Sequence, residues 1–165
     1  MNYISRLILD LIEPVIKSGE DIVRHFTVHN TLPQEFYNST EIHKRFFINQ
    51  RHAGWMNLVH IAGLQDNLDV LKVILQYCYD INAQSLTGYT ALDFTTSYDV
   101  AKYLIVEGKA SSNIKDIVGL TSLAKAYNLE KYNIVCLMLE HGANIDHCTD
   151  RPVVQDFKEN FLNKN

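Results

Sequence analysis

The sequence predicts an all-α fold in which about three similar helix pairs stack in a row as an α-solenoid. The first observation is a repeated motif: "LMLEHGANID" at residues 137–146 matches "VILQYCYDIN" at 73–82, with a looser third copy, "YLIVEGKASSN", at 103–113. The second is its spacing, because the segments upstream of these copies recur after about 33 and then about 31 residues. That is the period of a repeat containing a β-turn and two helices.

The upstream segments predict how the first helix of each pair begins. They are "WMNLVHIAG" at residues 55–63, "GYTALDFT" at 88–95 and "GLTSLAKA" at 119–126. Gly88 and Gly119 are expected in a turn where the backbone needs positive φ. Thr90 and Thr121 are expected to accept a hydrogen bond from the first backbone N–H groups of the helix that follows.

The second helix of each pair has a wide apolar face, from residues 70–75, 100–105 and 134–139. Such a face is wider than a single amphipathic helix needs. Burial of each large apolar side chain contributes about 1.5–3 kcal/mol, and one pair alone cannot bury its own face. We therefore expect each pair to be covered by its neighbours on both sides. Gly142 is expected to end the last such helix.

These segments resemble those of ankyrin-repeat proteins, whose motif is Gly-x-Thr-Pro-Leu-His-x-Ala-Ala, followed later by Gly-Ala-Asp-Val-Asn. "GYTALDFTT" and "GLTSLAKAY" keep the Gly, Thr and Leu, "NLVHIAG" keeps the histidine as His60, and "GANID" matches the ending. His60 is expected to make local hydrogen bonds. The departures from the motif are Leu58, Ala91 and Ser122 in place of Pro, and Asp93 and Ala124 in place of His.

The second repeat also lacks about three residues between Thr96 and Val100, so we expect its helix–helix turn to be shortened. The resemblance divides residues 51–148 into repeats at about 52–84, 85–115 and 116–148. Residues 149–165 are then expected to form a short helix that caps the last repeat, because the end of such a stack is apolar.

Residues 1–50 do not fit the repeat and are expected to form a helical extension. Helices are predicted at about residues 3–17, 20–29 and 40–50, with a loop between the last two and a capping box from Asn38 to Glu41. Two interpretations remain open. The extension either caps the first repeat or forms a separate docking element that binds the partner through Phe36, Tyr37, Phe46 and Phe47.

The composition argues against several classes of function. A net charge of −4 and a pI near 5.9 disfavour a nucleic-acid backbone as the main ligand. The chain has no apolar run of about 18 residues, so no membrane span is expected, and its start does not resemble a secretory signal. Three cysteines without a Cys-x-x-Cys motif favour a reducing compartment over a disulfide framework or structural zinc.

Catalytic and metal-binding motifs are not evident in the sequence. His25 and His29 have the spacing of two ligands on one helical face, yet no nearby Glu or Cys completes a zinc set. The sequence also has no Gly-x-Ser-x-Gly and no phosphate-binding loop. We therefore predict a non-enzymatic protein without a cofactor or metal. The alternative is a small metal-dependent enzyme that uses the early histidines, which are His25, His29, His43, His52 and His60.

The resemblance implies a concave groove lined by the turn tips and by the exposed side of each first helix. In this chain the tips are apolar or aromatic where the family usually has polar residues, and an exposed apolar row marks a partner site. The expected partner-binding residues are Met56, Leu64, Gln65, Leu86, Tyr89, Tyr98, Ile117, Val118, Leu120, Asn128 and Leu129. The alternative is that the N-terminal helices fold over these tips and bury them.

The predicted function is therefore that of a rigid protein–protein interaction module, monomeric by itself. Degenerate repeats in a chain rich in Ile, Asn, Tyr and Lys resemble those of intracellular bacteria and large DNA viruses, where such proteins often act on host proteins. The resemblance implies a cytoplasmic protein, and a host-directed effector delivered into a host cell is the more specific version of this hypothesis.

Overall fold

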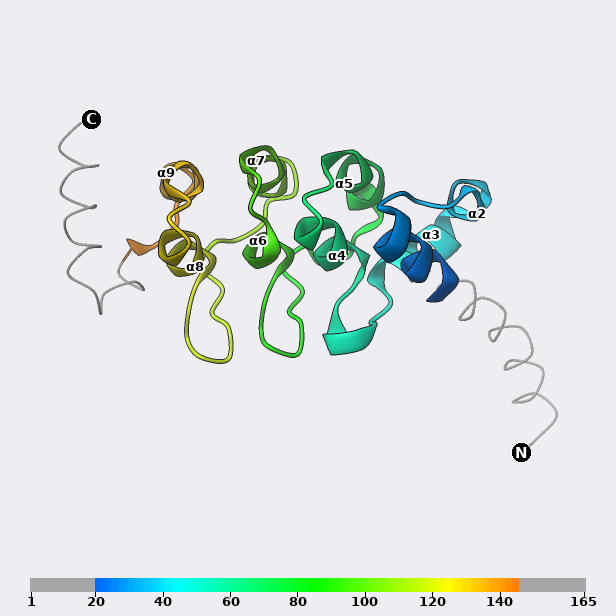
Figure 1. The fold of residues 1–165 in the computed structure, drawn as a ribbon, viewed down its shortest axis with the longest axis horizontal. Coiled ribbons are helices and arrows are strands. Elements are labelled where there is room, and N and C mark those ends of the chain that lie inside the picture. Colours follow the sequence, from blue (N-terminus) through cyan, green and yellow to red (C-terminus); the bar gives the residue numbers. More distant parts are fainter. Residues whose placement is uncertain (1–19, 146–165) are drawn as a thin grey trace.

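The computed structural model describes residues 20–145, and it shows three helix pairs standing side by side in a row (Figure 1). The first pair is α4 (Leu58–Leu64) and α5 (Leu68–Ile74), which continues into the short 3₁₀ helix η2 (Leu75–Tyr77). The second is α6 (Ala91–Phe94) and α7 (Tyr98–Val106). The third is α8 (Ser122–Asn128) and α9 (Tyr132–Glu140). This confirms the predicted all-α stack.

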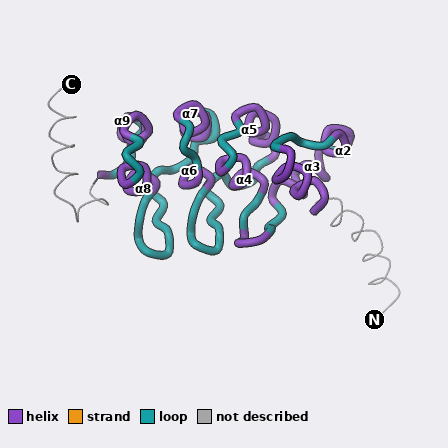
Figure 2. Tube along the Cα trace, in the orientation of Figure 1, coloured by secondary structure: helices purple, strands orange, loops and turns teal. Residues whose placement is uncertain are grey.

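The helices form two layers, with α4, α6 and α8 in an inner layer and α5, α7 and α9 in an outer layer (Figure 1). Three loops project from the inner layer, on the side away from the outer helices, and the first contains the 3₁₀ turn η1 (Ala53–Trp55) (Figure 2). Within residues 20–145 the backbone forms no strand beyond an isolated antiparallel bridge between Lys115 and Thr121. No helix in this range is long and apolar enough to cross a membrane.

The described N-terminal part is helical at residues 20–29, α2 (Gln34–Asn38) and α3 (Glu41–Asn49). The expected loop was wrong at α2. Five residues rarely hold a helix by themselves, but Phe36 on α2 is fully buried, so tertiary packing stabilises this turn. The N-cap of α3 is Thr40, whose side chain accepts from the His43 N–H at 3.3 Å, rather than the expected Asn38.

The N-terminal helices and the repeats share one buried core. Phe26, Phe47 and Ile48 belong to the same buried cluster as Leu71 of α5 and Leu104 of α7. Two side chains of the α4–α5 turn bind helix 20–29 and the residue after it. Gln65 Nε2 donates to the Thr27 carbonyl at 3.1 Å, and Asn67 Nδ2 donates to the Asn30 carbonyl at 2.7 Å. This attachment is the arrangement expected of a cap. The helices predicted at 3–17 and 149–165 lie outside the described residues.

The start of α4 is built as the motif predicts. The side chain of the N-cap residue Asn57 accepts from the N–H groups of Val59 and His60, at 3.1 and 3.2 Å. His60 Nε2 lies 3.2 Å from the carbonyl oxygen of Tyr89 in the next repeat. Because a carbonyl only accepts, Nε2 carries the proton, and Nδ1 accepts from the Asn57 N–H at 3.2 Å. His60 therefore joins the first repeat to the second.

The three residues missing from the second repeat are lost from its inner helix. Helix α6 has 4 residues, whereas α4 and α8 have 7 each. The connecting segments 65–67, 95–97 and 129–131 are equal in length, so the expected shorter turn was wrong. A helix of one turn leaves most of its terminal carbonyls and N–H groups without helical partners, and the turn after α6 needs support from elsewhere.

The Asp66 carboxylate of the first repeat supplies that support. It accepts hydrogen bonds from the Thr96 N–H at 3.0 Å, the Thr96 hydroxyl at 2.6 Å and the Ser97 N–H at 3.0 Å. The Thr95 hydroxyl also donates to it. Burial raises the pKa of Asp66, but the hydrogen bonds from Thr95, Thr96 and Ser97 outweigh it and hold this pKa below its usual value.

Replacing Asp66 with Asn tests this contact. Asn tolerates the positive φ of 50° at this position, but it loses the charge and one acceptor oxygen. We expect the free energy of unfolding, measured by urea denaturation, to fall by about 1–2 kcal/mol. The matched control is Asp69→Asn, three residues away and 97% exposed, which is expected to change little. Equal effects of the two substitutions would contradict this role of Asp66.

The pH dependence of stability tests the environment of His60. Burial lowers the pKa of His60 below its usual 6.5, and hydrogen bonds to the carbonyls of Ala83 and Tyr89 only partly offset this. The unfolded chain therefore binds a proton on His60 near pH 6.5 while the folded chain does not. The free energy of unfolding should fall as the pH drops below 6.5 toward the folded pKa.

His52, whose pKa burial also lowers, contributes in the same direction, so the measurement is best made in a His52→Gln background. Adding His60→Gln should flatten the decline between pH 7.5 and 5.5, because Gln does not titrate but keeps the capping box at this helix position. An unchanged slope in chemical denaturation would show that His60 is not the titrating group.

Candidate partner-binding surface

Three loops at the base of the inner helices form what we name the hairpin row: residues 51–57, 83–90 and 114–121. Each closes on itself by a backbone hydrogen bond. The carbonyls of Met56, Tyr89 and Leu120 accept from the N–H groups of His52, Ser85 and Asp116, at 2.8, 2.8 and 2.9 Å. Gly88 and Gly119 have φ of 80° and 85°, as predicted.

Neighbouring hairpins are bonded to one another along the row. The Leu86 N–H donates to the Gly54 carbonyl at 2.8 Å, and the Ile117 N–H donates to the Thr87 carbonyl at 3.2 Å. Backbones approach so closely that a Cβ on Gly88 would lie 2.8 Å from the Asp116 Cα. Side chains of the first and second hairpins add to these bonds, and the tips are therefore held at fixed positions.

A buried ionic network fixes the third hairpin. Lys125 Nζ lies 3.0 Å from a carboxylate oxygen of Asp93 and 3.1 Å from one of Asp116, and the three side chains are 10%, 1% and 0% exposed. The other Asp116 oxygen accepts from the N–H groups of Val118 and Leu120, both at 2.9 Å. Burial raises the pKa of Asp116, but these N–H donors and Lys125 together hold it below its usual value.

Asp93 takes part in this network at the position where the family motif has histidine. One carboxylate oxygen accepts from the Thr90 N–H and from the Thr90 hydroxyl, at 2.6 and 3.0 Å. The other accepts from the Ser122 hydroxyl of the third repeat at 2.6 Å. The Thr90 hydroxyl therefore donates to Asp93, and in the capping box its oxygen also accepts from the Asp93 N–H, as expected. The Thr121 side chain accepts from the Ala124 N–H, also as expected, at 3.4 Å.

The outer edge of the hairpin row is apolar and exposed. Leu86, Ile117 and Val118 are 64%, 73% and 72% exposed, Leu120 is 37% exposed and Met56 is half-buried. The described N-terminal helices lie beside α4 at one end of the row and do not cover the tips (Figure 1). The structure thus places five of the predicted residues on one accessible surface: Met56, Leu86, Ile117, Val118 and Leu120.

A family model for ankyrin repeats matches residues 37–148 in three copies. The chain belongs to the ankyrin-repeat family. It is 27% identical over 159 residues to an ankyrin repeat protein of fowlpox virus, a match covering 86% of this chain and 46% of the relative. It is 25% identical over 117 residues to one of Acanthamoeba polyphaga mimivirus, covering 69% of this chain and 14% of the relative. The chain thus spans less than half of either relative.

Trp55 was not among the predicted contacts, yet it is 63% exposed at the tip of the first ankyrin hairpin. The signal was present in the repeat spacing, since Trp55 occupies the position of Gly88 and Gly119 in the later repeats. Its φ of 59° is the left-handed conformation that those glycines adopt. A side chain there costs roughly 1–2 kcal/mol, and backbone strain of this kind is found preferentially at functional sites.

Substitution of Trp55 tests whether this strain is present. Trp55→Gly should be at least as stable as the native chain, because glycine adopts positive φ without strain and the indole buries little surface. Trp55→Ala keeps a Cβ and should be less stable than Trp55→Gly by about 1 kcal/mol in urea denaturation. If alanine is as stable as glycine at this position, the left-handed conformation of residue 55 is incorrect.

Tyr89 was predicted as a partner contact, but the structure places it behind the exposed edge. Its ring centroid lies 5.4 Å from that of Phe94 and 4.0 Å from Lys125 Nζ, and the residue is half-buried. Its carbonyl accepts from His60, as described above. Tyr89 therefore supports the hairpins, and a substitution there is expected to change stability as well as binding.

The remaining predicted residues form a second surface, which we name the turn row, at the helix–helix turns. Leu64, Tyr98 and Leu129 are 53%, 37% and 59% exposed, and Asn128 is also exposed. Gln65 is half-buried, and its side chain holds helix 20–29. The inner helices α4 and α8, each of 7 residues, separate this row from the hairpin tips by about 10 Å of helix.

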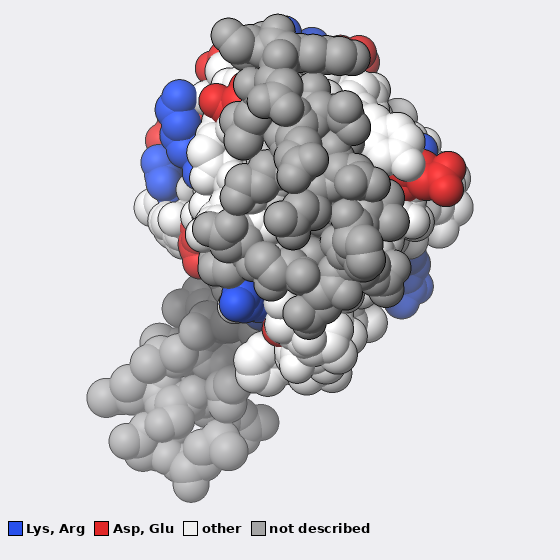
Figure 3. Space-filling model, turned by 90° about the vertical axis from the view of Figure 1, so that its left-hand side faces the viewer, with Lys and Arg blue, Asp and Glu red and all other residues white. Residues whose placement is uncertain are grey.

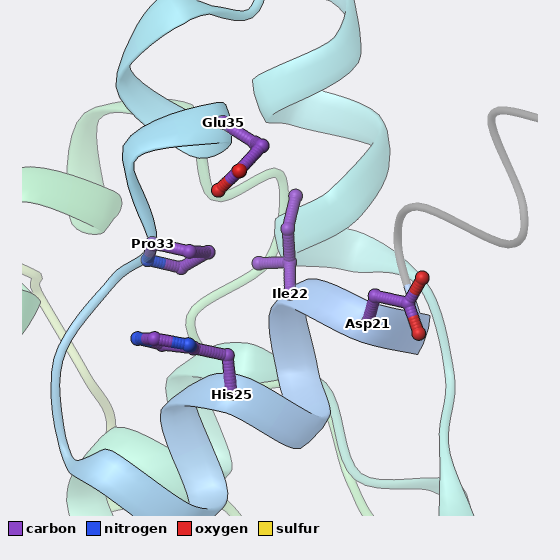
Figure 4. A pocket seen from close by; sticks show the side chains of 5 residues that line it. All are labelled: Asp21, Ile22, His25, Pro33 and Glu35. Atoms are coloured by element: carbon purple, nitrogen blue, oxygen red, sulfur yellow. The ribbon is translucent and has the colours of Figure 1, made fainter.

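Of the early histidines, His25 lines a shallow hollow of about 290 Å³ at the N-terminal end, together with Asp21, Ile22, Pro33 and Glu35 (Figure 4). The imidazole of His25 lies beside the Pro33 ring, and Ile22 stands among the polar groups. The His25 and His29 ring centroids are 4.5 Å apart. Within residues 20–145 no three His, Cys, Asp or Glu side chains are grouped so that they could hold a metal ion.

The described cysteines, Cys78 and Cys136, are half-buried and form no disulfide. Burial raises the pKa of both thiols. The thiolate is the nucleophilic form of cysteine, and a raised pKa disfavours that form in both side chains.

Charged side chains are dispersed at the α8–α9 end of the stack. Seen from that end, lysines and arginines lie apart from one another around the rim, with acidic groups between them (Figure 3). On the part of this face that the described residues form, they do not gather into a patch of one sign.

Proposed function

We propose that this ankyrin-repeat chain is a non-enzymatic protein-binding module that holds a partner protein against its hairpin row. Ankyrin repeats generally mediate protein–protein interaction. The observation that carries the proposal is the exposed apolar edge, where Trp55, Leu86, Ile117 and Val118 are each more than 60% exposed. An exposed apolar patch of this kind is expected at a partner site rather than on an unused surface.

The hydrogen bonds along the hairpin row favour a rigid mode of binding. Because the tips are already joined to each other and to the inner helices, a partner need not order them when it binds. Preorganisation of this kind improves affinity by reducing the entropy lost on association. The expected change in the backbone of the ankyrin repeats on binding is therefore small.

The turn row is proposed as an extension of this surface for a larger partner. Leu64, Tyr98 and Leu129 offer further exposed apolar area, and Asn128 lies beside Leu129. Tyr89 and Gln65 are not proposed as primary contacts, because their side chains support the fold.

A second candidate is an adaptor in which the N-terminal helices bind the partner. Two of its four predicted contacts are core residues, since Phe36 and Phe47 are 0% and 4% exposed. The exposed side chains that favour it are Tyr37, Ile42 and Phe46, at 47%, 78% and 37%. Ile42 and Phe46 share one face of α3, being four residues apart.

We further propose that the partner is a host protein encountered in the cytoplasm of an infected cell. The support is that both reported relatives are ankyrin repeat proteins of viruses. A host-directed effector role for this chain rests on that likeness and on the proposed binding surface together.

A capture experiment with matched surface variants tests the proposed function. Three double variants are compared. The first changes the hairpin row (Leu86→Ser with Ile117→Ser), and the second changes the turn row (Leu64→Ser with Leu129→Ser). The third changes the exposed face of α3 (Ile42→Ser with Phe46→Ser). Substitutions of exposed side chains usually change stability by no more than about 0.5 kcal/mol each, so thermal melts serve as the control for folding.

Each variant is used to capture proteins from a eukaryotic cell lysate, and the captured proteins are compared with those of the native chain. The hairpin variant is expected to capture less than a tenth of the amount of a specific partner that the native chain captures. The α3 variant is expected to capture as much of it as the native chain does. Retention by the hairpin variant together with loss by the α3 variant would replace the proposed function with the adaptor.

A further inference from the structure

We propose that the segment bound by the hairpin row is a stretch of protein whose apolar side chains are flanked by carboxylates. This inference rests on the proposed function and specifies the chemistry of its partner. It follows from the charges that the three hairpins carry beside their apolar edge.

The exposed formal charges of the hairpin row are positive. Among residues 51–57, 83–90 and 114–121 the lysines, arginines and acidic residues are Arg51, Lys115 and Asp116. Arg51 and Lys115 are exposed, whereas Asp116 is 0% exposed and paired with Lys125. The chain as a whole has a net charge of −4, so the cationic character of this surface is local.

The two cations belong to the first and the third hairpin. Arg51 Nη1 donates to the carbonyls of Trp55 and Gln84, at 2.8 and 3.1 Å, which holds the guanidinium between the first and second hairpins. Lys115 lies two residues before Ile117, and its backbone is fixed because its carbonyl accepts from Gln84 Nε2 at 3.0 Å. A bound apolar segment that follows the row would place its flanks near these charges.

The two ends of the row differ in their attraction for a carboxylate. Glu20 is exposed on the N-terminal helix and interacts with His52 of the first hairpin. Burial lowers the pKa of His52, and the Glu20 carboxylate raises that pKa by a smaller amount. That carboxylate partly offsets the charge of Arg51 for an incoming anion. We therefore place the stronger recognition of acidic side chains at the Lys115 end. Charge complementarity at an interface rim raises specificity and the rate of association.

Trp55 provides a direct probe, because it is the sole tryptophan of the sequence and lies at the tip of the first hairpin. Three synthetic peptides without tryptophan share one apolar core and carry Glu, Ser or Lys flanks. Each is titrated into the full chain while Trp55 fluorescence is recorded. The Glu peptide is expected to bind about tenfold more tightly than the Ser peptide at low salt, and the Lys peptide weakest. Added salt should narrow these differences.

Matched charge reversals locate the effect. Lys115→Glu and Lys102→Glu change the net charge equally, but Lys102 is exposed on the outer helix α7, away from the hairpins. Lys115→Glu should abolish the preference for the Glu peptide, while Lys102→Glu should retain it. Lys115→Gln, which removes charge without repulsion, is expected to give an intermediate result, and circular dichroism checks that each variant is folded.

The outcomes separate this inference from the proposed function. Equal binding of the three peptides to the native chain would overturn the charge inference but leave the apolar row as a binding surface. A preference that survives Lys115→Glu, or is lost equally with Lys102→Glu, would also overturn it. If no peptide changes the fluorescence of Trp55, this inference is wrong. The proposed function is tested separately, by the capture experiment with the Leu86→Ser and Ile117→Ser double variant.

Discussion

Each helix pair of this chain can bury its apolar side only against the pair beside it. Leu71 and Ile74 of α5, Leu104 of α7 and Ile134 of α9 are all fully or almost fully buried, although their own repeats supply too little surface to cover them. Stability in such an array is a sum over repeats and the contacts between them. The hairpin row depends on this constraint, because the stacking distance brings neighbouring tips within hydrogen-bonding range.

The polar contacts across the two boundaries between repeats are chemically different. Between the first and second, His60 reaches the Tyr89 carbonyl and Asp66 binds the turn after α6. Between the second and third, Lys125 lies between Asp93 and Asp116. A buried charge is tolerated when opposite charges pair with it, and Lys125 lies within 3.1 Å of two carboxylates. The same stacking geometry is therefore reached at one boundary with hydrogen bonds from uncharged donors, several of them to the Asp66 carboxylate, and at the other with ion pairs.

Much of this fold could be predicted from the sequence, because the repeat period and the turn glycines are local features with strong physical requirements. Three helix pairs, Gly88, Gly119 and the role of His60 followed from them. Helix α2 could not be predicted, since a five-residue helix depends on the burial of Phe36 by residues distant in the chain. The loss of about three residues from the second repeat was predicted, but it was assigned to the helix–helix turn and not to α6. No local feature of the sequence indicates that Asp66 of the first repeat supports the turn after α6.

The candidate surface was harder to predict than the fold. The exposure of a side chain depends on its neighbours in space. Leu86, Ile117 and Val118 are exposed, whereas Tyr89 packs against Phe94 and Lys125 and is half-buried. Trp55 was not predicted as a contact because glycine occupies the equivalent position in the other two repeats. A residue at that position is therefore expected to form the turn and not to bind a partner.

The ionic network has a consequence for how this array can evolve. Repeat proteins ordinarily gain or lose whole units by duplication and deletion, which works when any unit fits against any other. Removing the second repeat here would set the ammonium group of Lys125 against the first repeat, which has His60 in place of Asp93, and would leave that cation only partly compensated. Loss of the second repeat is thus expected to cost more stability than the loss of its apolar contacts alone, because a buried ammonium group without full pairing is unfavourable.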